Sequence, residues 1–164
     1  MTGFRVGNGF DSHRFVTGRP LMLGGVHVPH DAGLEGHSDG DCLVHAICDA
    51  LLGALAAGDL GTYFPSSDPR WAGSSSLVFL EDIGRMVAEK GFSIENIDST
   101  VIAEVPVLVL QVGEMRETLS RSLGIAMELV SVKAKSADQM GALGRGEGIA
   151  AHATALLRSQ ATDR

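Results

Sequence analysis

Cysteine and aromatic residues are scarce in this chain: 164 residues contain 2 cysteines, and aromatics make up 5%. Cys42 and Cys48 fall on one expected helix, six residues apart. That spacing separates them by roughly 9 Å along the helix axis and about 240° around it, so they cannot form a disulfide with each other. We interpret both as small buried hydrophobes in a reducing compartment.

Basic residues are also in the minority, with 13 Lys and Arg against 20 Asp and Glu and a formal net charge of −7. This balance argues against a nucleic acid or an anionic membrane surface as partner, because both select for clustered Lys and Arg. The chain has no uninterrupted run of 18 apolar residues, and its first residues lack the long apolar core of a targeting signal. We expect a cytoplasmic protein without a membrane span.

What the chain does contain is enough apolar material for a core: 45% of residues are hydrophobic, and the mean hydropathy is +0.16. This length suits one domain covering residues 1–164. The 21 glycines fall at segment joins such as 24–25 and 144–148, which is typical of tight turns around a site.

The periodicity of apolar residues predicts alternating strands and helices. The last expected strand is ambiguous, since its apolar residues alternate while its alanines alone favour a helix. A loop over 58–73 is rich in turn residues and is a place for ligand groups. We predict an α+β fold, a single-domain sandwich of one mixed β-sheet covered by about three helices. Strands are expected at 4–10, 21–23, 26–28, 97–105, 129–135 and 148–158, and helices at 41–56, 76–90 and 112–123.

A cluster of acidic and histidine residues near the start predicts a catalytic metal site. Asp11 and His13 are two residues apart on a strand, so both side chains project from one face, and His45 on the following helix could supply a third ligand. Three protein ligands leave one tetrahedral position open, which is the arrangement of catalytic zinc. Asp49 lies one helical turn after His45 and could support a neighbouring ligand, or the two could form a buried polar pair.

The order and spacing of several motifs resemble the 2-C-methyl-D-erythritol 2,4-cyclodiphosphate synthase family over nearly the whole chain. The resemblance rests on Gly9-Phe10-Asp11-Ser12-His13, Gly36-His37-Ser38-Asp39-Gly40-Asp41, His45-Ala46, the segments 49–54 and 58–61, Phe64-Pro65 and the segment 144–150.

This resemblance implies a homotrimer with active sites between adjacent subunits. The implied reaction converts 4-diphosphocytidyl-2-C-methyl-D-erythritol 2-phosphate, a cytidine diphosphate derivative, into the cyclic diphosphate with release of CMP. It also implies zinc on Asp11, His13 and His45, and a magnesium or manganese ion that bridges the diphosphate and is bound by Asp138.

By the same resemblance, His37 and Ser136 stabilise the transition state. For His37 the plainer alternative is a loop-capping histidine, and for Arg145 it is an intersubunit salt bridge with Glu147. Further implied substrate contacts are Ser38 on the erythritol phosphate, Asp59 and Gly61 on the erythritol hydroxyls with Leu60, Phe64 and Asp68 nearby, Ala103, Pro106, Val107, Leu108 and Val109 around the cytidine, and Lys135 and Arg145, the latter on a phosphate.

Four positions depart from the family pattern, all in the substrate region. Val107 stands where a lysine is common, Ser136 and Asp138 replace threonine and glutamate, and Ala142 replaces an aromatic residue. Two other functions therefore stay open: a zinc-dependent hydrolase of a phosphoester or nucleotide, with Asp49 as general base, and a non-catalytic metal-binding homologue whose pocket has drifted.

Overall fold

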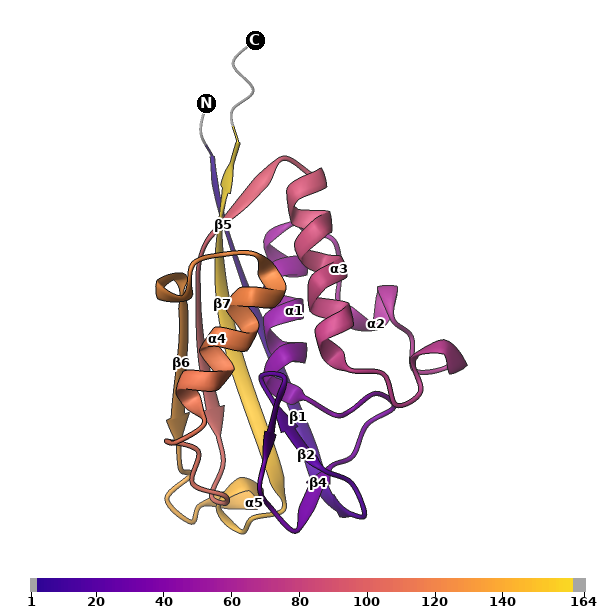
Figure 1. Ribbon diagram of the computed structural model, residues 1–164, viewed down its shortest axis with the longest axis vertical. Helices are drawn as coiled ribbons and strands as arrows, with labels where there is room; N and C mark the ends of the chain where they lie inside the picture. The colour runs from indigo at the N-terminus through magenta and orange to yellow at the C-terminus, as the bar shows by residue number, and fades with distance from the viewer. Residues whose placement is uncertain (1–2, 161–164) are drawn as a thin grey trace.

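A mixed five-stranded sheet carries the helices in the computed structural model, which describes residues 3–160 (Figure 1). The elements in chain order are β1 (Phe4–Thr17), β2 (Leu21–Leu23), β3 (Val26–Val28), β4 (Ala32–Leu34), α1 (Cys42–Ala54), α2 (Leu60–Tyr63), η1 (Pro69–Trp71), α3 (Ser76–Glu89), β5 (Phe92–Ile102), α4 (Val112–Leu123), η2 (Met127–Leu129), β6 (Val130–Lys135), α5 (Gly141–Gly144) and β7 (Gly148–Ser159).

The sheet has the strand order β4-β1-β7-β5-β6, while β2 and β3 form a separate hairpin. Strand β7 runs antiparallel to both β1 and β5, and β5 pairs in parallel with β6. The α+β class and the mixed sheet are therefore confirmed. The last segment is a strand, as predicted: Ala151, Ala153 and Ala155 are fully buried against the helices, and this packing outweighs the helix propensity of alanine.

Two glycines on β1 let helix α1 lie unusually close to the sheet. A Cβ atom on Gly7 would stand 2.1 Å from the Ala50 carbonyl oxygen, and one on Gly9 would stand 2.0 Å from that of Ala46. Neither distance leaves room for any side chain. The close approach brings His45 on α1 up to the side chains of β1.

Helix α1 is fixed at its start by a buried carboxylate. Asp41 is the N-cap and accepts a hydrogen bond from the Val44 backbone N–H at 3.0 Å. The same carboxylate accepts from the N–H groups of Gly24 at 2.9 Å and Gly25 at 2.7 Å, in the turn between β2 and β3. Burial raises the pKa of Asp41. Asp41 therefore joins the hairpin to the helix that carries His45.

Three expectations need correction. The first strand does not stop at residue 10, because β1 continues to pair with β7 through Arg14 and with β4 through Thr17, so Asp11 and His13 lie inside the strand. Strand β5 covers Phe92–Ile102, whereas the apolar pattern predicted 97–105. Pairing with β7 begins at Phe92, before the apolar pattern starts, and the last paired residue is Ile102. Two short helices, α2 and α5, accompany the three long ones.

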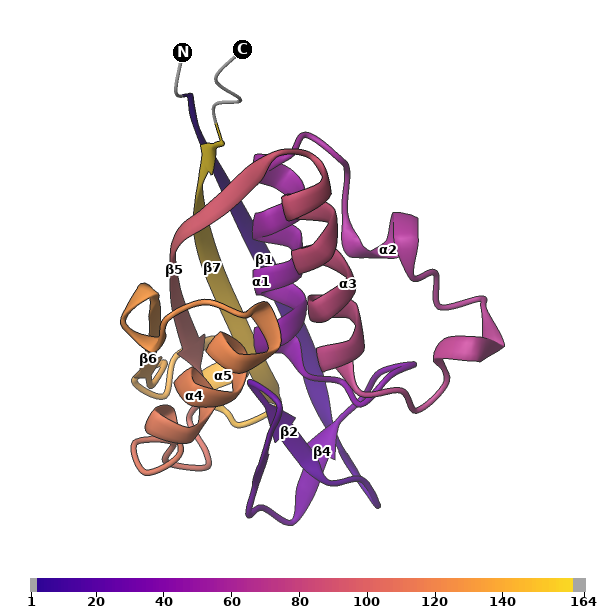
Figure 2. The same cartoon turned by 45° about the horizontal axis from the view of Figure 1, so that its top comes forward.

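The long helices α1, α3 and α4 lie on the same side of the sheet (Figure 2). On the other face Val6 is 66% exposed and Phe10 is 61% exposed. Phe10 continues into a row across the sheet with His152 and Thr100. One sheet face is therefore covered by helices, and the other presents apolar side chains to the outside.

Among residues 3–160, no helix combines the length and apolar character needed to cross a membrane.

Candidate metal centre and two clefts

Asp11, His13 and His45 converge as the sequence predicts. Asp11 Oδ2 lies 2.7 Å from His13 Nε2 and 2.9 Å from His45 Nδ1, and the two histidine nitrogens are 3.3 Å apart. One donor atom from each residue lies within 4.8 Å of the others. One carboxylate and two imidazoles fit the donor preference of zinc, and three ligands leave a coordination position for another group.

The electrostatics of this cluster follow from its burial and its internal pairing. Burial raises the pKa of Asp11, but the hydrogen bonds and charges of His13 and His45 outweigh it and hold the pKa well below 3.8. Burial lowers the pKa of His13, but Asp11 outweighs it and raises the pKa above 6.5. The carboxylate is thus ionised at neutral pH and ready to bind a cation.

The supporting contacts of the cluster differ from the sequence interpretation. Asp49 accepts a hydrogen bond from the Leu60 N–H at 2.7 Å, so its carboxylate fastens the start of α2. His45 Nε2 instead lies 2.9 Å from the hydroxyl oxygen of Ser76, at the start of α3. Sequence reasoning missed Ser76, because a serine at the start of a helix is typical of capping and carries no sign of a metal site.

A cleft of about 160 Å³ lies in front of this cluster, and we call it the metal cleft. His37 reaches it from the loop before α1, and its Nε2 lies 2.9 Å from the Asp68 carbonyl oxygen. Ser38 is buried beside His45, with 3.3 Å between the hydroxyl oxygen and Nε2. The lining residues are His13, His37, Ser38, His45, Leu60, Phe64, Ser66, Trp71 and Phe79.

Asp59, Gly61 and Asp68 lie between α1 and α3, close in sequence to the lining residues Leu60 and Ser66, but do not line the cleft themselves. Asp59 caps α2 by accepting from the Thr62 N–H at 2.9 Å, and Gly61 is exposed in that short helix. The Asp68 carboxylate pairs with Arg70 at 2.5 Å. Asp59 and Gly61 therefore flank Leu60, which lines the cleft, and the Asp59 and Asp68 carboxylates already hold their own loops in place.

A second cleft, of about 200 Å³, lies at the ends of β5 and β6, and we call it the loop cleft. Its floor is held by the Ala103 N–H, which donates to the Lys135 carbonyl oxygen at 2.9 Å. Val107 and Val109 at its rim are 79% and 69% exposed. The lining residues are Ala103, Glu104, Pro106, Val107, Leu108, Val109, Ala134, Lys135 and Ser136.

Ser136 and Asp138 contact each other beside the loop cleft. The Ser136 hydroxyl lies 3.2 Å from Asp138 Oδ1, and the Asp138 N–H donates to that hydroxyl at 3.3 Å. Asp138 has a positive φ of 49° in this turn. Among residues 3–160, the one cluster of three or more metal-ligating side chains is Asp11, His13 and His45, so Asp138 stands outside any such cluster.

The two clefts lie on different parts of the sheet and share no lining residue. His13 lies on β1, whereas Ser136 directly follows β6, and β7 and β5 lie between these strands. Three strand spacings correspond to roughly 14 Å. The chain therefore does not bring together His37 and Ser136, the two residues expected to act on the same transition state.

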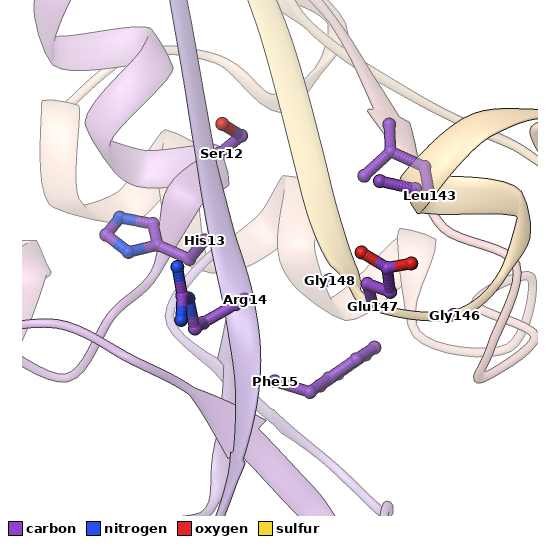
Figure 3. Close-up of a pocket in the computed structure, with 9 residues that line it drawn as sticks. Ser12, His13, Arg14, Phe15, Leu143, Gly146, Glu147 and Gly148 are labelled. Carbon is purple, nitrogen blue, oxygen red and sulfur yellow. The ribbon is translucent and has the colours of Figure 1, made fainter.

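Glu147 lines a third and larger hollow, of about 640 Å³ (Figure 3), and Arg145 pairs with it. Arg145 Nε lies 2.6 Å from Glu147 Oε1, so this ion pair forms within one chain. Figure 3 shows the His13 ring on the opposite side of β1 from Leu143 and Glu147. This hollow therefore touches the metal cluster only through His13.

A three-ligand centre beside a cleft, on an α+β sheet covered on one face, is an arrangement that suits a metal-assisted enzyme. The model of the YgbB family matches residues 4–158. The 2-C-methyl-D-erythritol 2,4-cyclodiphosphate synthase of Acaryochloris marina is 50% identical over 159 residues, which is 97% of this chain and 99% of that protein. The synthase of Laribacter hongkongensis is 54% identical over 156 residues, 95% and 96% of the two chains.

Solved structures agree with this likeness. The bifunctional IspDF of Campylobacter jejuni superposes with a TM-score of 0.93 at 36% identity, over 97% of this chain and 43% of that one. A CDP complex of Plasmodium falciparum IspF gives 0.85 at 33% identity, over 97% and 98%. These relatives include phosphorus–oxygen lyases, and the chain is an enzyme of that class. It belongs to the YgbB family, the family of the 2-C-methyl-D-erythritol 2,4-cyclodiphosphate synthases.

Proposed function

We propose that this chain cyclises 4-diphosphocytidyl-2-C-methyl-D-erythritol 2-phosphate to the 2,4-cyclodiphosphate and releases CMP. In this reaction the 2-phosphate attacks the β-phosphorus of the same molecule, and the bond from that phosphorus to the CMP oxygen breaks. The observation that carries the proposal is the convergence of Asp11, His13 and His45 beside the cleft that His37 enters. The names of the relatives at about 50% identity support it.

Asp11, His13 and His45 would hold zinc in this proposal. Their donor atoms are close enough for one ion, and the lowered pKa of Asp11 keeps its carboxylate in the binding form. When bound, zinc supplies Lewis acidity to a phosphate oxygen and orients it. Asp138 would bind a magnesium or manganese ion together with the diphosphate, and its exposed carboxylate beside the loop cleft supports that assignment.

The protein's own groups would place the substrate. Asp59 and Gly61 would contact the erythritol hydroxyls next to the metal cleft, and Ser38 would contact its phosphate. His37 and Ser136 would donate hydrogen bonds to the charge that develops at phosphorus, an effect that requires both to lie near one substrate. The apolar loop cleft would receive the cytidine, with Lys135 at its floor and Arg145 available to a phosphate when it leaves Glu147.

We further propose a homotrimer in which each active site combines the metal cleft of one subunit with the loop cleft of the next. Two observations support this assembly. The uncovered sheet face carries exposed Val6 and Phe10, which association would bury. The two clefts of one chain are separated by the width of the sheet, so a closed ring of subunits is a simple way to bring them together.

The experiment that tests the function uses the zinc-loaded protein with the proposed substrate and magnesium, followed by phosphorus NMR and mass spectrometry. Cyclic diphosphate and CMP in equal amounts are the expected products. Linear hydrolysis products would replace the proposal with the hydrolase. Unchanged substrate, from protein that carries zinc, would indicate a non-catalytic homologue.

A further inference from the structure

His45 has two ring nitrogens, and the structure gives them different surroundings. Nδ1 faces the metal cluster, 2.9 Å from Asp11 Oδ2, whereas Nε2 faces away and lies 2.9 Å from the hydroxyl oxygen of Ser76. A neutral imidazole carries its proton on one nitrogen and a lone pair on the other. Nδ1 can bind a metal only when the proton is on Nε2, so the partner of Nε2 decides whether His45 is ready to act as a ligand.

The direction of the Ser76 hydroxyl follows from its second partner. Ser76 is fully buried, and its oxygen lies 2.5 Å from Oδ1 of Asp39. In this contact the hydroxyl donates its hydrogen to the Asp39 carboxylate oxygen. The lone pairs of the hydroxyl oxygen then face His45, and Nε2–H must be the donor. Asp39 is itself fixed, because it accepts from the Ser76 N–H at 3.0 Å and from the Asp41 N–H at 3.2 Å.

Two neighbouring contacts are consistent with this direction. Helix α3 already has a cap, since the Ser75 side chain accepts from the Leu77 N–H at 3.4 Å, so the Ser76 hydroxyl is not needed for capping. Ser38 also approaches His45 Nε2, but at the longer distance of 3.3 Å. Ser76 is therefore the principal partner of Nε2.

We propose that Ser76 and Asp39 are positioning residues that hold His45 with its proton on Nε2 and its Nδ1 lone pair aimed at the metal. Metal-binding histidines commonly donate their other N–H to a carboxylate, and here a buried hydroxyl stands between the two. The inference rests on the proposed assignment of His45 as a zinc ligand. It adds two residues that neither contact the metal nor lie on the elements that carry its ligands.

The test measures zinc affinity rather than turnover. Zinc alone is titrated into the metal-free protein in competition with a chromogenic chelator, for the wild type, Ser76→Ala and Asp39→Ala. Loss of such an outer partner lowers metal affinity by about 10- to 100-fold, which is the change expected for both variants. Ser75→Ala is the matched control, because it removes the neighbouring hydroxyl and weakens the same helix start without touching His45. Its zinc affinity should equal that of the wild type.

A second measurement reads the proton directly. Nitrogen-15 NMR of the zinc-loaded wild type should show a proton on His45 Nε2 that exchanges slowly with water, because the buried Ser76 hydroxyl accepts it, and Ser76→Ala should show faster exchange. Ser76→Thr, which keeps the hydroxyl, should restore both the slow exchange and the zinc affinity.

The outcomes separate this inference from the function on which it rests. A wild type that binds no zinc would overturn the metal site itself. A wild type that binds zinc, together with folded Ser76→Ala or Asp39→Ala protein of equal affinity, would overturn only the positioning role. A loss of the same size in Ser75→Ala would also overturn it, because it would trace the effect to the start of α3. Circular dichroism shows whether each variant is folded. If Ser76→Ala does not fold, Asp39→Ala is used to test the positioning role.

Discussion

The metal cleft and the loop cleft are built in different ways. Around the metal cleft, the ligand side chains come from a long strand and a closely packed helix, and buried groups such as Ser76 hold them in place. Around the loop cleft, Val107 and Val109 are largely exposed, and Ser136 and Asp138 lie in an exposed turn. The metal cleft is therefore arranged by the fold of a single chain, whereas the loop cleft is bordered by exposed side chains and an exposed turn.

The largest effect is expected from removing a ligand in the metal cleft. His45→Ala should lose its zinc and at least about 1,000-fold in turnover, or roughly 4 kcal/mol of transition-state stabilisation. Zinc content by atomic absorption and CMP release are the measurements. His27→Ala, an exposed histidine on β3, is the control and should keep both. Full activity in a zinc-free His45→Ala protein would contradict the assigned role.

The next effect tests whether the two clefts serve the same active site across subunits. His37→Ala and Ser136→Ala should each reduce turnover by about 100-fold or more, as expected for loss of one transition-state donor. Unfolding and refolding the two variants together in equal amounts should restore about one quarter of the wild-type sites in mixed rings. Each variant refolded alone is the control. No recovery from the mixture would contradict an active site that is shared between subunits.

A stability measurement tests the close packing behind the metal cleft. Gly9→Ala would place its Cβ 2.0 Å from the Ala46 carbonyl oxygen, so α1 must shift. We expect a loss of about 1–3 kcal/mol in the free energy of unfolding, measured with urea. Gly113→Ala on α4 meets nothing within 4 Å, and helix propensity predicts a gain of about 0.5–1 kcal/mol. Equal stability of Gly9→Ala and the wild type would contradict the packing argument.

The smallest effect concerns the loop cleft. Val107→Lys should tighten CDP binding in the presence of magnesium by roughly twofold to fivefold, because an exposed ion pair contributes about 0.2–1 kcal/mol. Titration calorimetry measures the change, and high salt should abolish it. Val78→Lys, at a partly exposed position on α3, is the control for added charge. Weaker binding by Val107→Lys would show that this rim does not face the diphosphate.

The sequence predicted the parts of the site that depend on local geometry. Asp11 and His13 share a strand face because side chains alternate, and the α4 helix over 112–123 has the expected bounds because Gly124 ends it. The predicted end of β1 at residue 10 was wrong, because pairing with a strand far along the chain decides how long β1 continues. Ser76 was missed for the same reason: it meets His45 only when α3 packs against α1, and no spacing in the sequence records that contact.

The separation of the two clefts has a consequence in genetic terms if each site is shared between neighbouring subunits. A cell that makes equal amounts of intact chain and chain damaged in one cleft would retain about half of its active sites, because each damaged copy spoils one site in a ring. Damage to both clefts of the same chain would leave about one quarter, because each such copy spoils two sites. A doubly damaged allele would thus interfere with its intact partner more strongly than either single lesion does.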